Sequence, residues 1–190
     1  MNARIELTMD KTTFFRWVQE QDRRYDRVDG KAIVQQGSTQ HHDRVASEFQ
    51  FQLRSQLDPD TWLVFGTDFA VDLGDQIRYP DVMVHKMNDD AKAMSTLAPT
   101  VLVEVLSSSS VVTDLNIKTP RYRSQRSLDA HIVASQDEAR CRVWQRDTRK
   151  SDRPFPVEAA IVHGNDARID IAALGISIAL KDNYRGMFKS

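Results

Sequence analysis

The chain has 190 residues, of which 28% are charged and 41% are aliphatic or aromatic. This composition fits one globular domain over residues 1–190 and excludes a disordered or fibrous protein. The net charge of −1 excludes a strong overall positive field of the kind that attracts nucleic acid. The sequence has no run of roughly 18 apolar residues and no signal-peptide segment, so we expect a cytoplasmic protein with no membrane partner.

The first third of the chain predicts a helix, a hairpin and a second helix. Thr12 or Thr13 can cap a short helix that ends within residues 20–24. Asp29-Gly30 stands between two strand-like segments and favours a two-residue hairpin turn of type I′. Residues 40–57 then carry apolar side chains four positions apart, which predicts an amphipathic helix. The apolar stripe consists of Val45, Phe49, Leu53 and Leu57.

Short apolar segments separated by polar turns dominate the rest of the chain, and they predict strands. These segments are Trp62–Phe65, Phe69–Leu73, Pro80–His85, Thr100–Leu106, Ala130–Ala134, Cys141–Arg146, Val157–Val162, Ala167–Ile171 and Ile176–Leu180. Residues 107–126 are expected to be helical in part. Helices first, then mostly antiparallel strands with one helix covering the sheet, indicate an α/β or α+β domain.

Glu104 is the strongest anomaly in the sequence, because it interrupts the otherwise apolar strand Val101–Leu106. Side chains alternate along a strand, so Glu104 shares one apolar face with Leu102 and Leu106 while three valines form the other. With both faces apolar, the strand is expected to be central and Glu104 to be partly buried. A buried carboxylate must be protonated, paired with a cation or bound to a metal.

Asp81 is the second informative carboxylate. It follows Pro80 at the start of a strand, where proline is tolerated and where a side chain is accessible from the adjoining loop. If the strands of Asp81 and Glu104 lie side by side, both carboxylates can reach one hard divalent cation such as Mg²⁺ or Mn²⁺. Two simpler explanations stay open: a strand-end turn for Asp81 and a salt bridge for Glu104.

Basic residues gather locally in spite of the balanced charge. Residues 116–126 carry Lys118, Arg121, Arg123 and Arg126 without an acid, and a second basic run covers residues 140–153. Either run could neutralise the phosphates of a nucleic acid, and a solvated protein surface is an equally good explanation.

Four segments together resemble the Uma-two-like restriction endonuclease family, within the PD-(D/E)xK nuclease superfamily. They are Tyr25-Asp26-Arg27-Val28-Asp29-Gly30, His42 with Val45, Arg78-Tyr79-Pro80-Asp81-Val82-Met83-Val84, and Val103-Glu104-Val105-Leu106-Ser107 leading through Asp114 and Lys118 to Tyr122. The resemblance spans roughly residues 12–184. It implies a restriction-endonuclease-like mixed sheet flanked by helices, with Asp81 and Glu104 as metal ligands.

The resemblance also implies a catalytic lysine, which in the superfamily usually stands two residues after the glutamate. Leu106 occupies that position, and Lys118 stands where the family offers a lysine on the following helix. Asp114 and Tyr122 lie four residues to either side of Lys118, on one face if the helix is continuous. However, Pro120 predicts that this helix is kinked or begins again at Thr119, which could turn Lys118 away from the carboxylates.

Two further residues are candidates for the surroundings of the metal. Asp26 stands where the family tends to have glutamate, and a surface position in the hairpin is an equally good explanation. His42, near a helix N-terminus, could orient a water molecule or a phosphate, although a capping or packing role is the simpler explanation.

The sequence therefore favours a Mg²⁺- or Mn²⁺-dependent endonuclease that hydrolyses phosphodiester bonds of DNA. In this hypothesis Asp81, Glu104 and Lys118 are catalytic, and Arg121, Arg123 and Arg126 bind the DNA backbone. One alternative is a catalytically inactive protein that uses the same fold to bind DNA or protein, and another is a nuclease directed at RNA or at repair substrates. A homodimer is compatible with duplex cleavage, but no sequence feature specifies its interface.

Overall fold

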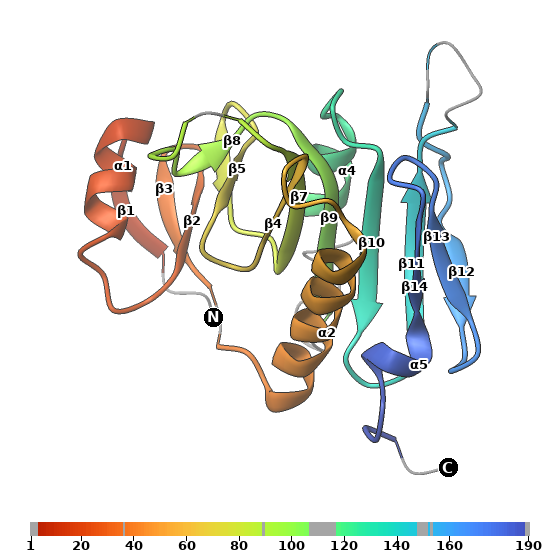
Figure 1. Ribbon diagram of the computed structural model, residues 1–190. Helices are drawn as coiled ribbons and strands as arrows, with labels where there is room; N and C mark the ends of the chain where they lie inside the picture. Colours follow the sequence, from red (N-terminus) through yellow and green to blue (C-terminus); the bar gives the residue numbers. More distant parts are fainter. Residues whose placement is uncertain are drawn as a thin grey trace.

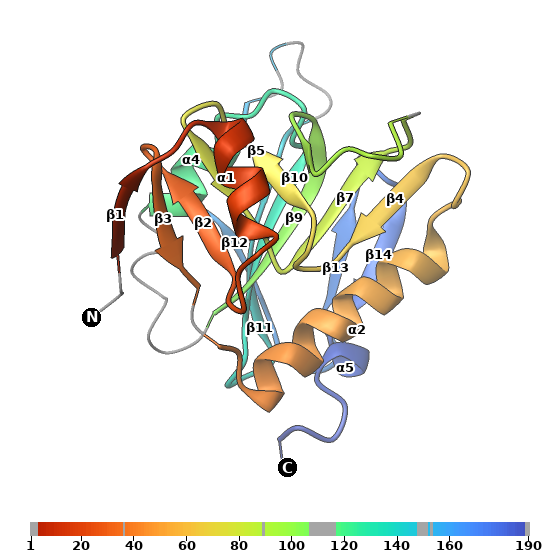
Figure 2. The ribbon, with the colours of Figure 1, turned by 90° about the vertical axis from the view of Figure 1, so that its left-hand side faces the viewer.

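The computed structural model describes residues 4–35, 37–88, 90–106, 117–147, 152 and 154–188. These residues form two six-stranded sheets and a two-stranded ribbon, with helices packed around them (Figures 1 and 2). None of the helices in this part of the chain has the length and apolar character of a membrane span.

The first sheet is built mainly from the N-terminal half of the chain, with the strand order β1-β3-β2-β6-β5-β8. Its strands are β1 (Arg4–Thr8), β2 (Tyr25–Val28), β3 (Lys31–Val34), β5 (Ala70–Asp72), β6 (Gln76–Arg78) and β8 (Ser95–Thr96). Helix α1 (Lys11–Val18) buries Phe14 in a cluster with Ala32 and Ile77 of this sheet. The predicted hairpin is confirmed: β2 and β3 join at Asp29 and Gly30, whose φ angles of 50° and 81° suit a type I′ turn.

The second sheet has the strand order β12-β11-β10-β9-β7-β4. Its strands are β4 (Trp62–Phe65), β7 (Val82–Lys86), β9 (Pro99–Leu106), β10 (Ala130–Ser135), β11 (Arg140–Gln145) and β12 (Ala160–His163). Strands β9 and β10 run parallel, and the other neighbours in this sheet are antiparallel. The central position of β9, buried along its whole length, agrees with its prediction as a strand with two apolar faces.

The two faces of this second sheet pack against different partners. On one face, Val101, Val103 and Val105 of β9 join the apolar stripe of helix α2 (Gln40–Gln56) in the largest core cluster. The ribbon of β13 (Arg168–Ile171) and β14 (Ile176–Ala179), followed by helix α5 (Leu180–Asn183), contributes to the same cluster. On the other face, Leu102 packs with Met83, with Val71 of the first sheet and with Tyr122 of helix α4 (Thr119–Arg123). Glu104 belongs to this second face, between the two sheets.

The structure departs from the sequence predictions mainly at the ends of elements. Asp10, rather than Thr12 or Thr13, caps α1, because its side chain accepts a hydrogen bond from Thr13 N at 2.7 Å. Strands β1, β6 and β8 were not predicted, and β12 begins at Ala160 instead of Val157. Of the segment expected to be partly helical, residues 107–116 lie outside the described residues, and helix α4 covers its later part.

Candidate active site

Asp81 and Glu104 lie at the same end of neighbouring strands. Strands β7 and β9 are antiparallel, with Val82 opposite Val103. Asp81 immediately precedes β7, so extending this register by one residue puts Asp81 opposite Glu104. Residues directly opposite each other in an antiparallel pair share a face of the sheet. The prediction that the two strands lie side by side is therefore confirmed.

Asp81 is held by the neighbouring strand and by helix α2. Its Oδ2 atom accepts a hydrogen bond from Val105 N at 2.7 Å, and Nε2 of His42 lies 3.4 Å from the same oxygen. The side chains of His42 and Asp81 are only 16% and 13% exposed. Burial by itself would lower the pKa of His42, but the hydrogen bond and the negative charge of Asp81 outweigh it and raise this pKa. The side chain of His42 is thus a partner of the Asp81 carboxylate. The N-cap of the helix is Thr39, whose side chain accepts a hydrogen bond from His42 N.

Glu104 is buried, with 4% of its surface exposed, and helix α4 supplies polar partners for it. The hydroxyl of Tyr122 donates to Glu104 Oε1 at 2.8 Å, and Lys118 Nζ lies 3.4 Å and 3.5 Å from the two carboxylate oxygens. Burial, followed by the charge of Glu104, raises the pKa of Tyr122 well above its ordinary value. Lys118 and Tyr122 therefore converge on the glutamate.

Pro120 lies close to Lys118, at the start of helix α4. Helix α4 begins at Thr119, with Lys118 as its N-cap and Pro120 in the first turn. A proline there removes no helical hydrogen bond, because the first N–H groups of a helix have no partner within it. The predicted cap at Thr119 is wrong, because Ile117 and Lys118 already form a π-helical turn directly before α4, and Lys118 is turned toward Glu104 and not away from it. Asp114 lies outside the described residues.

Asp26 is buried in an ion pair, so its alternative assignment as a surface residue of the hairpin is wrong. Arg78 Nη1 donates to Asp26 Oδ2 at 2.8 Å, and both side chains are only 6% exposed. Gln35 Nε2 and Tyr79 N donate to the other carboxylate oxygen at 2.7 Å and 3.2 Å. Burial by itself would lower the pKa of Arg78. The negative charge of Asp26 outweighs the effect of burial and raises this pKa, and the charge of Glu104 raises it further. Sequence reasoning missed Arg78 as the buried partner of Asp26.

His131 is a second residue that sequence reasoning missed. It lies on the face of the sheet that carries Glu104, fully buried, with its ring stacked 5.7 Å from Trp144 and edge-on to Tyr122 at 5.4 Å. Neither of its ring nitrogens has a hydrogen-bond partner among the described residues. Burial lowers the pKa of His131 to about 3.

The buried imidazole of His131 should make the protein less stable at mildly acidic pH. Its folded-state pKa of about 3 lies below the ordinary value of 6.5, so the unfolded chain binds a proton first as the pH falls. The resulting loss of stability begins near pH 6.5 and approaches about 1.4 kcal/mol for each further pH unit. His131→Phe keeps the stacked ring and should flatten the pH dependence of the free energy of unfolding between pH 6.5 and 5, measured by urea denaturation. The matched change His41→Phe, at an exposed position, should leave the slope unchanged; equal slopes in wild type and His131→Phe would contradict this interpretation.

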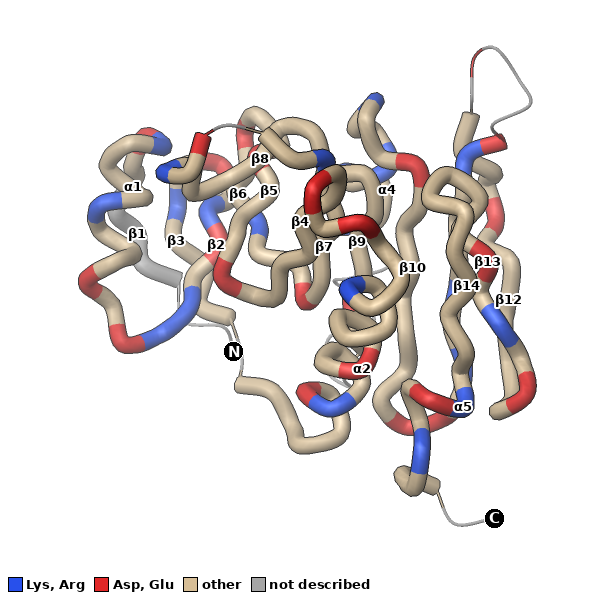
Figure 3. Tube along the Cα trace, viewed as in Figure 1, with Lys and Arg blue, Asp and Glu red and all other residues tan. Residues whose placement is uncertain are grey.

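The three predicted DNA-binding arginines have different surroundings. Arg121 forms an ion pair with Asp75 at 3.0 Å, and both side chains are about half exposed. Arg123 lies over the ring of Trp144 at 5.2 Å and donates to the backbone oxygens of Pro156 and Val157, so its described contacts bind the chain to itself. Arg126 is exposed. Acidic and basic residues intermingle along the whole described trace, and DNA contact by these arginines stays a prediction (Figure 3).

The donor set around Asp81 and Glu104 fits a hard divalent cation. Carboxylate oxygens are the ligands that Mg²⁺ prefers, and this ion commonly keeps several waters while binding one or two carboxylates. The described residues contain no group of three or more His, Cys, Asp and Glu side chains arranged to hold a metal. Waters and substrate oxygens would therefore complete the coordination of a cation bound by this carboxylate pair.

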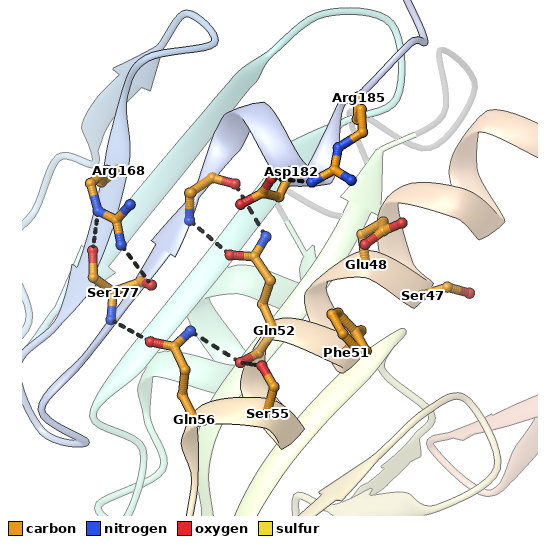
Figure 4. Close-up of a pocket in the computed structure, with 11 residues that line it drawn as sticks. Ser47, Glu48, Phe51, Gln52, Ser55, Gln56, Arg168, Ser177, Asp182 and Arg185 are labelled. Atoms are coloured by element: carbon orange, nitrogen blue, oxygen red, sulfur yellow. Dashed lines mark hydrogen bonds and ion pairs between the residues drawn. The ribbon is translucent and has the colours of Figure 1, made fainter.

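A hollow in the described part of the structure lies elsewhere. It has a volume of about 650 Å³ and lies between helix α2, strand β14 and helix α5 (Figure 4). Phe51, Gln52, Arg168 and Arg185 are among its lining residues, and none of the predicted site residues lines it. This hollow is open, and its lining mixes polar and apolar residues. We therefore keep the carboxylate pair as the candidate site.

The comparisons with known proteins agree with the fold and with the family resemblance. The family model Uma2, described as "Putative restriction endonuclease", matches residues 12–173. A solved structure described as "a putative nuclease belonging to DUF820" from Anabaena variabilis ATCC 29413 superposes with a TM-score of 0.72 at 16% sequence identity. That match covers 91% of this chain and 96% of the other, which confirms the restriction-endonuclease-like fold. A comparison with curated proteins gave no match.

Proposed function

The chain belongs to the Uma2 family of restriction endonuclease-like proteins, and on that premise we propose that it is a Mg²⁺- or Mn²⁺-dependent endonuclease acting on DNA. The observation that carries this proposal is the convergence of two carboxylates from adjacent strands with one lysine. Asp81 and Glu104 lie opposite each other in register, and Lys118 Nζ is 3.4 Å from Glu104. Two carboxylates can hold a divalent cation for phosphodiester hydrolysis, and a lysine beside them can stabilise charge on the phosphate.

The residues of the chain have distinct tasks in this proposal. Asp81 and Glu104 would hold the divalent cation, which when bound lowers the pKa of a water and neutralises charge on the phosphate. The N–H of Val105 fixes the carboxylate of Asp81, and the hydroxyl of Tyr122 fixes that of Glu104. Lys118 is already beside Glu104, where its charge can orient the attacking water or stabilise the phosphate.

DNA is the substrate we favour, with Arg121 and Arg126 as the outer phosphate contacts. Their guanidinium groups belong to the same short segment as Lys118, and Arg126 is exposed. Contacts of this kind position a nucleic-acid backbone without reading its sequence. An inactive protein that binds DNA is the second candidate, and the ion pairs that already occupy both carboxylates favour it.

Nuclease assays separate these two candidates. Purified protein is incubated with Mg²⁺ or Mn²⁺ and with plasmid DNA, single-stranded DNA or RNA, and the products are separated on gels. We expect plasmid cleavage that EDTA abolishes. Cleavage of RNA alone would transfer the proposal to an RNA substrate, whereas DNA binding without any cleavage would support the inactive protein.

Lys118→Met should reduce the cleavage rate by roughly two to three orders of magnitude, the usual effect of losing one electrostatic contact to a transition state. The methionine preserves the length and much of the packing of the lysine side chain. Lys86→Met, at an exposed position of strand β7, is the matched control and should cleave at the wild-type rate. Equal rates for Lys118→Met and wild type would remove Lys118 from the proposed mechanism.

A further inference from the structure

Asp26 and Arg78 lie on the same face of the first sheet. Strands β2 and β6 are antiparallel, with Arg27 opposite Ile77, and extending this register by one residue puts Asp26 opposite Arg78. On the other side of β6, Val71 of β5 lies opposite Arg78. Residues opposite each other in an antiparallel pair share a face of the sheet. Asp26, Arg78 and Val71 therefore share one face.

This face of the first sheet is turned toward Glu104. Val71 packs against Leu102 of β9, between the two sheets. Leu102 and Glu104 share a face of β9, because side chains alternate along a strand. Burial alone would lower the pKa of Arg78, whereas the charge of Asp26 and, more weakly, that of Glu104 raise it. A buried arginine therefore lies across the space between the sheets from a proposed cation ligand.

The contacts of Arg78 leave part of its guanidinium group available. Its Nε atom donates to Gln76 Oε1 at 2.9 Å, and Nη1 donates to Asp26 Oδ2 at 2.8 Å. In the described part of the chain, Nη2 of Arg78 has no hydrogen-bond partner. An arginine side chain keeps its proton in a folded protein, so its positive charge on this face opposes a cation beside Glu104. The carboxylate of Asp26 supplies the compensating charge.

Asp26 also holds the short connection that carries Asp81. Residues 79–81 link β6 of the first sheet to β7 of the second. Asp26 Oδ1 accepts hydrogen bonds from Gln35 Nε2 at 2.7 Å and from Tyr79 N at 3.2 Å. The two carboxylate oxygens of Asp26 thus have separate tasks, because one binds the backbone that leads to Asp81 and the other binds Arg78.

We propose that Asp26 is a positioning residue of the cation site, which neutralises Arg78 and holds its guanidinium group away from Glu104 without itself binding the cation. Both oxygens of Asp26 already accept hydrogen bonds, and the side chains of Asp26 and Arg78 are only 6% exposed. A cation would have to displace a buried guanidinium group to reach this carboxylate. The inference rests on the proposed function, because it presupposes a divalent cation held by Asp81 and Glu104.

Titration of the full chain with Mn²⁺ alone, followed by the electron paramagnetic resonance signal of free Mn²⁺, tests this proposal without any cleavage reaction. Asp26→Asn keeps the side-chain oxygen that accepts from Tyr79 N and removes the negative charge. Arg78 then has no compensating carboxylate, and its charge opposes the cation. We expect the dissociation constant for Mn²⁺ to rise roughly tenfold or more.

The double variant Asp26→Asn/Arg78→Met restores the neutral balance of the wild-type pair. We expect its dissociation constant to return to within roughly threefold of the wild-type value, because neither charge is left uncompensated. Asp72→Asn is the matched control, since it breaks the ion pair of Asp72 with Lys11. Asp72 follows Val71 in β5 and lies on the opposite face of the same sheet, so this variant should bind Mn²⁺ like wild type.

The outcomes separate this inference from the proposed function. A wild-type chain that binds no Mn²⁺ would refute the proposed function and the inference with it. If wild type binds Mn²⁺, a double variant that binds as weakly as Asp26→Asn would overturn the inference alone, because Asp26 would then be needed as a ligand. Wild-type affinity in Asp26→Asn would overturn it as well. Should Asp26→Asn fail to fold, the double variant decides, and weaker Mn²⁺ binding than in wild type would refute the positioning role.

Discussion

Glu104→Gln and Asp81→Asn are each expected to abolish metal-dependent DNA cleavage while leaving the fold intact. Both changes keep the shape of the side chain, and glutamine at position 104 can still accept the hydroxyl of Tyr122. Each removes one of the two negative charges that would hold the cation. A divalent cation contributes several kcal/mol to stabilising the transition state, so the rate should fall by roughly 10³-fold or more.

A control variant must show that the loss of any one carboxylate charge does not by itself reduce cleavage. Asp60→Asn, on an exposed turn before β4 and beside the end of β7 opposite to Asp81, should cleave at the wild-type rate. Circular dichroism and the thermal midpoint confirm that each variant is folded. Full activity in both Glu104→Gln and Asp81→Asn would exclude a catalytic role for the carboxylate pair.

Arg78→Met should destabilise the protein by about 3–5 kcal/mol, the usual cost of removing one partner from a buried ion pair. The change leaves the carboxylate of Asp26, only 6% exposed, without its cation. Urea denaturation measures the loss. The exposed pair of Arg24 and Asp68, whose side chains are 57% and 91% exposed, is the matched control, and Arg24→Met should cost less than about 1 kcal/mol.

A double variant distinguishes the ion pair from general damage to the core. Asp26→Asn removes the uncompensated charge, so combining it with Arg78→Met should recover a large part of the lost stability. Additive losses in the double variant would mean that the two side chains act independently, and the buried pair would then have no special energetic role.

The carboxylate pair could be predicted from sequence because both residues break a local rule. Glu104 interrupts an apolar strand, and Asp81 follows a proline at a strand start, so each carries a signal in its own segment. Their partners Lys118 and Tyr122 were found only through the family resemblance. Nothing in the local sequence predicts that the short helix α4, which begins at Thr119, packs Tyr122 against Leu102 of β9.

Arg78 and His131 illustrate what local patterns did not reveal. Arg78 ends the three-residue strand β6, and its burial depends on Asp26 from a hairpin 52 residues earlier in the chain. His131 did carry a detectable signal, since it interrupts the apolar strand Ala130–Ser135 just as Glu104 interrupts its own strand. The same reasoning applied to His131 would have predicted a buried polar residue beside the site.

Element boundaries show where tertiary contacts outweigh local preference. The hairpin and the long helix were predicted well, because a turn with positive φ angles and an apolar stripe are local features. Strand β6 was missed because its polar residues Gln76 and Arg78 are buried by bonding to each other and to Asp26. Strands of this kind are stabilised by contacts with residues distant in the sequence, so their own hydropathy pattern does not predict them.

Diffraction from crystals soaked in Mn²⁺, with anomalous scattering recorded, tests the central claim most directly. We predict one Mn²⁺ per chain, bound at about 2.1 Å to one carboxylate oxygen of Asp81 and one of Glu104. His42 and Lys118 would then have moved away from the carboxylate oxygens they now approach at 3.4 Å. A structure in which both ion pairs persist at saturating Mn²⁺, with no anomalous peak between the two carboxylates, would contradict the account.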